Sequence, residues 1–270
     1  MSFSHQFKER LLTVDKVHLN YGDKKILRDV NLKIDNVVRE GMHQGQTVAL
    51  LGPSGVGKTQ LFRCIAGLQM PSSGKVTLNN DTDNVEAGEV GVVFQNYPLL
   101  NHRTVWGNLK LAAKKTKKKD EHITLLLERF GIVDKQKLFP SQLSGGQRQR
   151  VAIIQQLLCS SHFLLMDEPF SGLDVRMKAE VCKLINEVST VDELNTTIIT
   201  THDIDTAVKI ADTVWIMGFE HDAEGRRIPG ATCIRQIDLI ERDLAWHPDV
   251  KNQPNYVPTV REIEAIFMTT

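Results

Sequence analysis

Short, mostly apolar runs recur along the chain, and stretches with helical spacing separate them. The runs lie at residues 48–51, 90–94, 163–166, 197–200 and 213–217. Runs this short are typical of strands buried on both faces of a sheet, whereas residues 61–68, 147–158 and 177–188 have the apolar spacing of helices. Because strands and helices alternate, the sequence predicts an α/β fold with a mostly parallel sheet that is covered by helices on both faces.

The two ends and one internal stretch depart from this alternation. Residues 12–14 and 31–34 favour two strands on either side of a turn at Tyr21 and Gly22, which predicts an antiparallel β piece before the core. Between Gln95 and Ser144 the sequence is polar, helical and rich in lysine, as expected for a helical insertion. Beyond Met217 it becomes irregular, and there we expect a short strand at 231–234 and a final helix at 260–267.

These patterns predict one domain over residues 1–270. Residues 1–95 and 151–218 would form the core, residues 96–150 an inserted helical subdomain and residues 219–270 a C-terminal extension. The chain is long enough to bury a substantial core.

Composition narrows the class of protein. The 33 basic residues balance the 33 acidic ones, so charge gives no argument for a nucleic-acid partner. The four cysteines lie far apart without a CxxC pair, which favours reduced, buried thiols over a zinc or redox site. The first ten residues lack the apolar stretch of a signal peptide, and no run of about 18 apolar residues occurs. A membrane role would therefore require a separate partner.

A glycine-rich loop follows the apolar run at 48–51. It consists of Gly52, Pro53, Ser54, Gly55, Val56, Gly57, Lys58 and Thr59. Glycines let the backbone turn tightly, so that successive N–H groups can point at phosphate oxygens. Lys58 would supply positive charge to the β and γ phosphates, and the Thr59 hydroxyl would ligate Mg²⁺ at the positive end of the following helix. The sequence therefore predicts a phosphate-binding loop.

Two carboxylates end the apolar run at 163–166. Asp167 is placed for direct or indirect contact with Mg²⁺, and Glu168 for polarising the water that attacks the γ-phosphate. An acidic pair before a proline is also common on protein surfaces. The phosphate-binding loop elsewhere in the chain favours the catalytic interpretation.

A third string consists of Leu143, Ser144, Gly145, Gly146 and Gln147. It resembles the signature of ATP-binding cassette (ABC) ATPases. The serine hydroxyl and glycine amides at a helix N-terminus can contact phosphate. In the family this phosphate belongs to ATP held by the other subunit, so that two ATP molecules lie between paired subunits. The resemblance implies a P-loop NTPase core, ATP and Mg²⁺ as cofactors, transport-coupled ATP hydrolysis and a dimer, most simply a homodimer.

Further motifs follow in the family's order. Gln95 resembles the glutamine that senses Mg²⁺ and water, and Asp174 belongs to a segment that crosses the dimer interface. His202 matches the histidine that contacts the γ-phosphate, and Tyr21 the aromatic that stacks on adenine. The resemblance thus implies catalytic roles for Glu168, His202, Gln95 and Lys58, metal ligation by Thr59, Gln95 and Asp167, and nucleotide contacts by Tyr21, Gly52, Pro53, Ser54, Gly55, Val56, Gly57, Lys58, Thr59, Gln60, Ser144, Gly145, Gly146, Gln147 and Asp174.

Two stretches depart from the family pattern. Residues 35–44 are longer than the usual link to the phosphate-loop strand, and we expect a surface excursion there. Residues 153–157 replace the usual alanine-arginine-alanine run, so a common arginine is absent from the signature helix. The second departure leaves the catalytic residues untouched.

The resemblance also implies partners. Residues 95–100 would form a groove for a membrane permease, although their apolar side chains could instead pack on the helical subdomain. The permease would hold the chain at the cytoplasmic face of the membrane, and a solute-binding protein outside could act through it. We expect an importer of the nitrate, sulfonate and taurine type. The alternatives are an exporter, a lipid transporter, a permease-free ATPase acting on nucleic acid or ribosomes, and a binding protein without catalysis, against which the intact catalytic residues argue.

The basic run at 114–119 is a separate candidate site. A solvated loop is the first interpretation, contact with anionic lipid headgroups the second and nucleic acid the third. No nucleic-acid partner is therefore expected.

Overall fold

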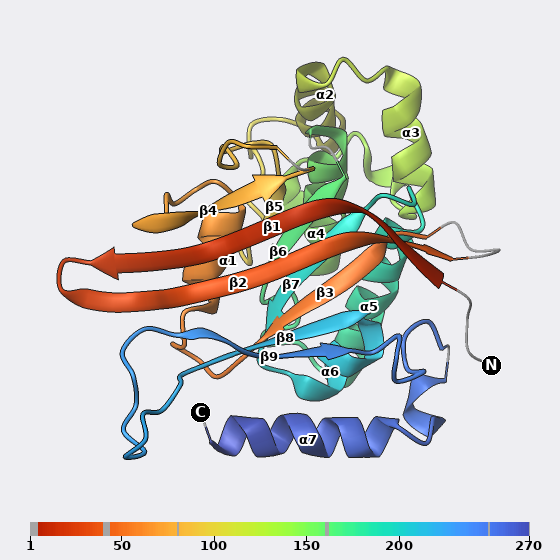
Figure 1. Ribbon diagram of the computed structural model, residues 1–270. Helices are drawn as coiled ribbons and strands as arrows, with labels where there is room; N and C mark the ends of the chain where they lie inside the picture. The colour runs from red at the N-terminus through yellow and green to blue at the C-terminus, as the bar shows by residue number, and fades with distance from the viewer. Residues whose placement is uncertain (1–4, 40–43, 80, 160–161, 248, 270) are drawn as a thin grey trace.

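The computed structural model describes residues 5–39, 44–79, 81–159, 162–247 and 249–269, which form two sheets with helices around them (Figure 1). The larger sheet has six strands in the order β5-β6-β7-β3-β8-β9, and the smaller has three in the order β2-β1-β4. The larger sheet consists of β3 (Gln46–Leu51), β5 (Gly91–Val93), β6 (Phe163–Asp167), β7 (Thr196–Thr201), β8 (Thr213–Gly218) and β9 (Thr232–Asp238). All its pairings are parallel except that of β8 with β9. The predicted α/β fold class is confirmed.

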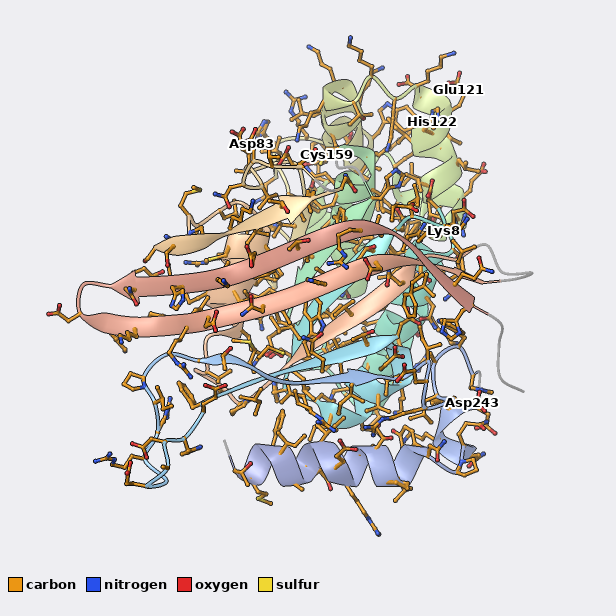
Figure 2. All side chains as sticks on the ribbon, in the orientation of Figure 1. Lys8, Asp83, Glu121, His122, Cys159 and Asp243 are labelled. Carbon is orange, nitrogen blue, oxygen red and sulfur yellow. The ribbon has the colours of Figure 1, made fainter. Side chains whose placement is uncertain are left out.

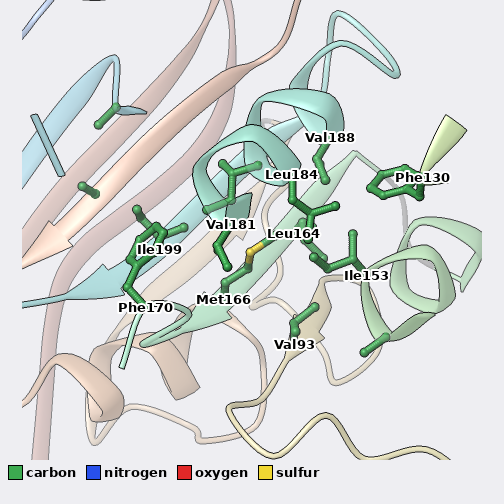
Figure 3. Packing of buried hydrophobic residues seen from close by; sticks show 14 of the residues in the cluster. Val93, Phe130, Ile153, Leu164, Met166, Phe170, Val181, Leu184, Val188 and Ile199 are labelled. Carbon is green, nitrogen blue, oxygen red and sulfur yellow. The ribbon is translucent and has the colours of Figure 1, made fainter. Parts of the chain in front are cut away.

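Both faces of the large sheet are buried, as the continuous apolar runs predict. Along β3, Ala49 and Leu51 point into one core, while Val48 and Leu50 point into another. The first core lies beneath α4 (Gly145–Cys159), α5 (Val175–Ser189), α6 (Ile204–Ile210) and α7 (Tyr256–Met268). Figure 3 shows side chains of β6 and α5, such as Met166 and Val181, packed together in this layer.

The second core is closed by α1 (Lys58–Ile65) and the small antiparallel sheet. In this sheet β1 (His5–Tyr21) pairs with β2 (Lys24–Arg39) around the predicted turn at Gly22, and with β4 (Ser73–Leu78) on its other side. The antiparallel β piece is thus confirmed, and it is longer than predicted.

The expectation of a surface excursion at residues 35–44 is wrong for its first half. Residues 35–39 continue β2, because they pair with residues 5–10 of β1. Asn36 is buried and donates a hydrogen bond from Nδ2 to Glu9 Oε1 at 2.9 Å, and Val37 is buried. Cross-strand pairing thus extends the hairpin where the local sequence favours a link. Residues 40–43 lie outside the described residues.

The predicted helical insertion is present. It contains α2 (Val105–Lys115), α3 (Asp120–Arg129) and the short 3-10 helices η1 (Val133–Lys135) and η2 (Pro140–Gln142). Exposed side chains of α3, among them Glu121 and His122, lie at the periphery of the molecule (Figure 2). The same insertion leads directly into α4, which packs against α2 and β5 and so connects the insertion to the core.

The basic run at 114–119, which begins in the last turn of α2 and continues in the loop before α3, is only partly solvated. Lys118 is half-buried and donates from Nζ to the Leu157 carbonyl at 2.7 Å, and Lys115 donates to the Gly88 carbonyl at 2.6 Å. Burial lowers the pKa of Lys118. One lysine at the end of α2 and one in the loop therefore bond to neighbouring segments, while Lys114 is exposed.

The C-terminal extension contains β9, the 3-10 helix η3 (Val250–Asn252) and α7, which confirms the expected strand and final helix. Pro258 lies in the first turn of α7, where a missing N–H costs nothing because it would have no partner inside the helix. In Figure 1, α7 runs alongside α6 on the side away from β1 and β2.

Within the described ranges, none of the helices is long and apolar enough to cross a bilayer. The four cysteines are free thiols; Cys64 is buried, as predicted, whereas the other three are only half-buried.

Candidate nucleotide-binding site

The glycine-rich loop joins β3 to α1, as predicted. Gly55 and Gly57 have φ angles of 81° and 112°, in the left-handed region that favours glycine. A Cβ on Gly52 would lie 2.9 Å from the Met217 carbonyl oxygen, so only glycine lets the loop pass this close to β8. The first N–H groups of α1 lack partners inside the helix and are available to an anion.

Lys58, the first residue of α1, folds its side chain back into this loop. Its Nζ donates to the carbonyl oxygens of Gly52 at 2.7 Å and Pro53 at 3.2 Å, and lies 3.5 Å from Glu168 Oε1. The side chain is buried, and this burial lowers the pKa of Lys58, while Glu168 and Asp167 oppose the shift. The ammonium is thus held at the centre of the loop, next to the predicted catalytic carboxylate.

The two predicted carboxylates lie at the end of β6, beside β7. Thr200 of β7 donates from Oγ1 to Asp167 Oδ1 at 2.7 Å and accepts from the Glu168 amide at 2.9 Å. Glu168 has a φ of 47°, a left-handed conformation that non-glycine residues seldom adopt. One hydroxyl therefore fixes both residues, and the turn directs the glutamate toward Lys58.

His202, which follows β7, completes the cluster. Its Nδ1 lies 3.0 Å from Glu168 Oε2, and more than half of the side chain is exposed. Glu168 thus contacts Lys58 through one oxygen and His202 through the other. Since β6, β7 and β3 are adjacent and parallel, their carboxyl ends bring together three segments that are far apart in the sequence.

The residues predicted to hold Mg²⁺ supply suitable donors. They are the hydroxyl of Thr59 in the first turn of α1, the carboxylate of Asp167 and the amide oxygen of Gln95, which is exposed beyond β5. Oxygen donors with one carboxylate suit Mg²⁺, which retains several waters. Thr200 engages Oδ1 of Asp167, which orients the carboxylate at the strand end. The residues present therefore fit the ion.

Tyr21 lies at the end of β1, where nearly half of its side chain is exposed. Its hydroxyl donates to Gln60 Oε1 in α1 at 2.7 Å. This bond brings the predicted adenine-stacking ring next to the helix that follows the phosphate-binding loop.

The signature residues lie at the start of α4. Gln147 N donates to Ser144 Oγ at 3.3 Å, and Ser144 N donates to Gln147 Oε1 at 2.9 Å, which is a reciprocal helix cap. A cavity of about 560 Å³ adjoins them and is lined by Tyr97, Gly131, Ile132, Ser144, Gly145, Gly146, Gln147, Gln149, Arg150, Leu173, Met177 and Glu180. None of these residues belongs to the phosphate-binding loop, so the structure separates the signature from the cluster around Lys58.

Asp174 lies at the N-cap of α5 and accepts from Met177 N at 2.8 Å. The Asp174 side chain thus has a local structural role as the cap of α5. Its hydrogen-bond partner Met177 also lines the signature cavity.

The sequence did not single out two residues of these sites, Thr200 and Gln149. Thr200 makes the hydrogen bonds to Asp167 and Glu168, and only its position two residues before His202 could have suggested a role. Gln149 is buried in the wall of the signature cavity, and its Nε2 has no hydrogen-bond partner among the described residues. Its position two residues after Gln147 of the signature was the available signal.

Comparison with known proteins identifies the class. A family model described as "ABC transporter" matches residues 36–171. The sulfate/thiosulfate import ATP-binding protein CysA of Synechocystis sp. is 36% identical over 76% of this chain and 58% of that protein. The glutamine transport ATP-binding protein GlnQ of Bacillus subtilis is 37% identical over 76% of this chain and 85% of that protein. The chain therefore belongs to the ABC transporter family of ATP-binding proteins.

Solved structures agree with this assignment. CbiO1 of Clostridium perfringens, described as part of the ABC transporter complex cbiONQ, superposes with a TM-score of 0.69 and 27% identity, over 95% of this chain and 100% of that chain. The ATP-binding subunit of another ABC transporter has the same TM-score at 20% identity, which supports the fold alone. ATP-binding subunits of this family bind ATP with Mg²⁺ and hydrolyse it to power transport. The chain spans a little over half the length of the sulfate/thiosulfate relative.

Proposed function

We propose that this chain is the ATP-hydrolysing subunit of an ABC importer, forming one domain with the core, helical subdomain and extension bounded as predicted. The observation that carries the proposal is the position of Glu168 between Lys58 and His202, at the carboxyl ends of three adjacent strands. This is the edge of a parallel sheet at which α/β proteins bind ligands.

The phosphates of ATP would be bound within one chain. Backbone N–H groups of residues 54–59 surround the phosphates, and Lys58 contacts the β and γ phosphates once ATP draws its ammonium away from the loop carbonyls. Tyr21 stacks on the adenine, and Gln60 holds the tyrosine hydroxyl. Thr59, Asp167 and Gln95 would hold Mg²⁺, which neutralises phosphate charge when bound.

The hydrolytic step is assigned to Glu168. Its carboxylate orients the attacking water and accepts its proton, while His202 holds the glutamate through Nδ1 and contacts the γ-phosphate. Thr200 holds the turn at Glu168 and the carboxylate of Asp167 in position through its hydroxyl. Lys58 stabilises the charge that develops on the phosphate oxygens.

The signature residues are assigned to a second nucleotide. Ser144, Gly145, Gly146 and Gln147 at the start of α4 would contact the phosphate of ATP bound by a partner, and Asp174 would lie at the same interface. Their separation from the phosphate-binding loop supports this assignment. A second copy of this chain is the simplest partner.

Transport requires a membrane permease, which we place at residues 95–100. Within it Leu100 is more than one third exposed, as is Phe94 just before it, whereas Tyr97 and Leu99 pack against the core that includes side chains of α2 and α4. The segment therefore offers an apolar side chain to a partner, while two others pack on the chain itself. Asn108 of α2 fixes the segment by accepting from Leu100 N at 2.8 Å. The permease would hold the chain at the cytoplasmic face of the membrane, and a solute-binding protein could act through it.

The solute is proposed to be small and hydrophilic. The names of the relatives include sulfate/thiosulfate and glutamine transport, so import is favoured over export or lipid transport. Within this class, we retain the proposal from the sequence that the solute is of the nitrate, sulfonate and taurine type.

The proposal is tested by purifying the chain from native membranes and identifying the proteins that accompany it. We expect a multispan permease, and ATP hydrolysis that rises when the complex is reconstituted with solute and its binding protein. Recovery with ribosomes or DNA and no permease would instead indicate the permease-free alternative.

A further inference from the structure

Helix α6 links the catalytic histidine to the C-terminal extension. The helix begins two residues after His202, and Asp205 lies in its first turn. The Tyr256 hydroxyl, at the start of α7, donates to Asp205 Oδ1. Lys251 of η3 places its Nζ 3.3 Å from the same oxygen, and Lys209 pairs with the other. The extension thus contacts α6 one turn from the catalytic cluster.

The bond between Tyr256 and Asp205 is buried enough to hold its geometry. Tyr256 is only 6% exposed, and burial together with the neighbouring carboxylate raises the pKa of its hydroxyl, which remains a donor at neutral pH. Burial alone would raise the pKa of Asp205, but hydrogen bonds from Lys209 and Tyr256 lower it overall. A charged acceptor thus meets a neutral donor, which makes a strong hydrogen bond.

The other end of the His202 turn is fixed separately. Asp203 caps α6 by accepting from Thr206 N at 3.0 Å, pairs with Lys178 of α5, and donates from its own amide to Thr201 Oγ1 at 3.1 Å. Since α6 has only seven residues, it depends on neighbours for its position. Its first turn is therefore anchored on one side by α5 and on the other by the extension.

The extension is itself well supported. Arg242, in the turn that carries Asp243 (Figure 2), donates to Glu262 Oε2 at 2.7 Å and to Thr259 Oγ1 at 3.1 Å. Ile263 of α7 is fully buried in the core beneath the large sheet. A rigid α7 can fix the position of α6, whereas a loosely attached tail could not.

We propose that the C-terminal extension positions His202 for ATP hydrolysis, with Tyr256 and Lys251 as positioning residues that act through Asp205. Without them, the first turn of α6 shifts, and the imidazole loses its alignment with Glu168. The inference rests on the proposed function in that it assigns the aligned histidine a role in hydrolysis. The proposal also assigns residues 249–269, which lie outside the phosphate-binding loop, a role in catalysis.

The test is Tyr256→Phe in the full chain, which removes one hydroxyl and keeps the ring. We expect kcat for ATP hydrolysis to fall about fivefold with KM within about twofold, because misalignment affects the chemical step more than binding. The matched control is Thr259→Val, which removes another buried hydroxyl from α7, one that accepts a hydrogen bond from Arg242. Arg242 keeps its bond to Glu262 Oε2 at 2.7 Å in this variant, so α7 stays attached. The control should retain the wild-type rate.

Two further measurements separate positioning from general destabilisation. In a His202→Ala background, Tyr256→Phe should lower the rate no further. Amide hydrogen exchange at residues 202–206 of the nucleotide-free protein should be faster in Tyr256→Phe than in Thr259→Val. Wild-type turnover by Tyr256→Phe, or equal losses in both variants, would overturn the inference. If the wild-type chain hydrolyses no ATP but the exchange difference appears, the contact stands and the proposed function fails.

Discussion

The cluster around Glu168 and the signature at the start of α4 differ in how complete they are. In the cluster, Lys58 and His202 each contact Glu168, and Thr200 fixes the strand end. The signature instead adjoins an open cavity that no residue of the phosphate-binding loop lines. Pairwise contacts of 2.9 Å, 3.0 Å and 3.5 Å define a site within one chain, whereas in the proposed function the signature contacts a ligand that another chain brings. This difference supports the proposal that the complete ATPase site is built from two half-sites.

The largest effect is expected from Glu168→Gln, which keeps the size of the side chain and removes its basicity. We expect kcat to fall by at least about 100-fold, because general-base catalysis typically contributes that much. ATP affinity measured by calorimetry should change by less than about threefold, since the phosphate-binding loop is intact. An ATP-bound dimer should accumulate, detectable by size-exclusion chromatography.

The control for this variant is Glu241→Gln, an exposed glutamate in the turn after β9. It should hydrolyse ATP at the wild-type rate. Turnover by Glu168→Gln close to that of the control would remove Glu168 from the proposed mechanism and leave the preformed cluster without a base.

A smaller effect is expected from Thr200→Val, which removes the hydroxyl between Asp167 and Glu168. We expect kcat to fall about tenfold through misplacement of the glutamate turn, and unfolding free energy to fall by about 1 kcal/mol through the lost hydrogen bonds. Steady-state kinetics and urea denaturation measure the two quantities.

The same strand offers a matched control. The buried Thr197 hydroxyl has no hydrogen-bond partner among the described residues, so Thr197→Val should leave turnover unchanged and cost no stability. Equal effects of the two substitutions would show that the hydroxyl of Thr200 has no special role in the cluster.

The parts of the fold that depend on local pattern could be predicted from the sequence. A run at 48–51, a glycine loop and a helix define the phosphate-binding loop within 20 residues, and the end of β6 places Asp167 and Glu168. Parallel pairing then brings these segments to one edge. The fold class and the position of this edge follow directly from such patterns.

The features that the sequence did not predict depend on contacts between distant segments. Residues 35–39 contain polar side chains, so their sequence predicted a link between strands. Pairing with residues 5–10 of β1 instead makes them part of β2. Lys118 belongs to a basic run and yet reaches the Leu157 carbonyl. The bond from Tyr256 to Asp205 joins residues 51 positions apart. Neither partner of such a contact carries a local signal.

The central claim, that each nucleotide is shared between two chains, is tested most directly by mixing two inactive variants. Lys58→Ala disables the phosphate-binding loop, and Ser144→Arg blocks the signature of the chain that carries it. In a mixed dimer one site has both defects and the other has neither. We expect the mixture to hydrolyse ATP at about one quarter of the wild-type rate, as random pairing into dimers predicts. A rate no higher than the average of the two variants alone would contradict the shared site.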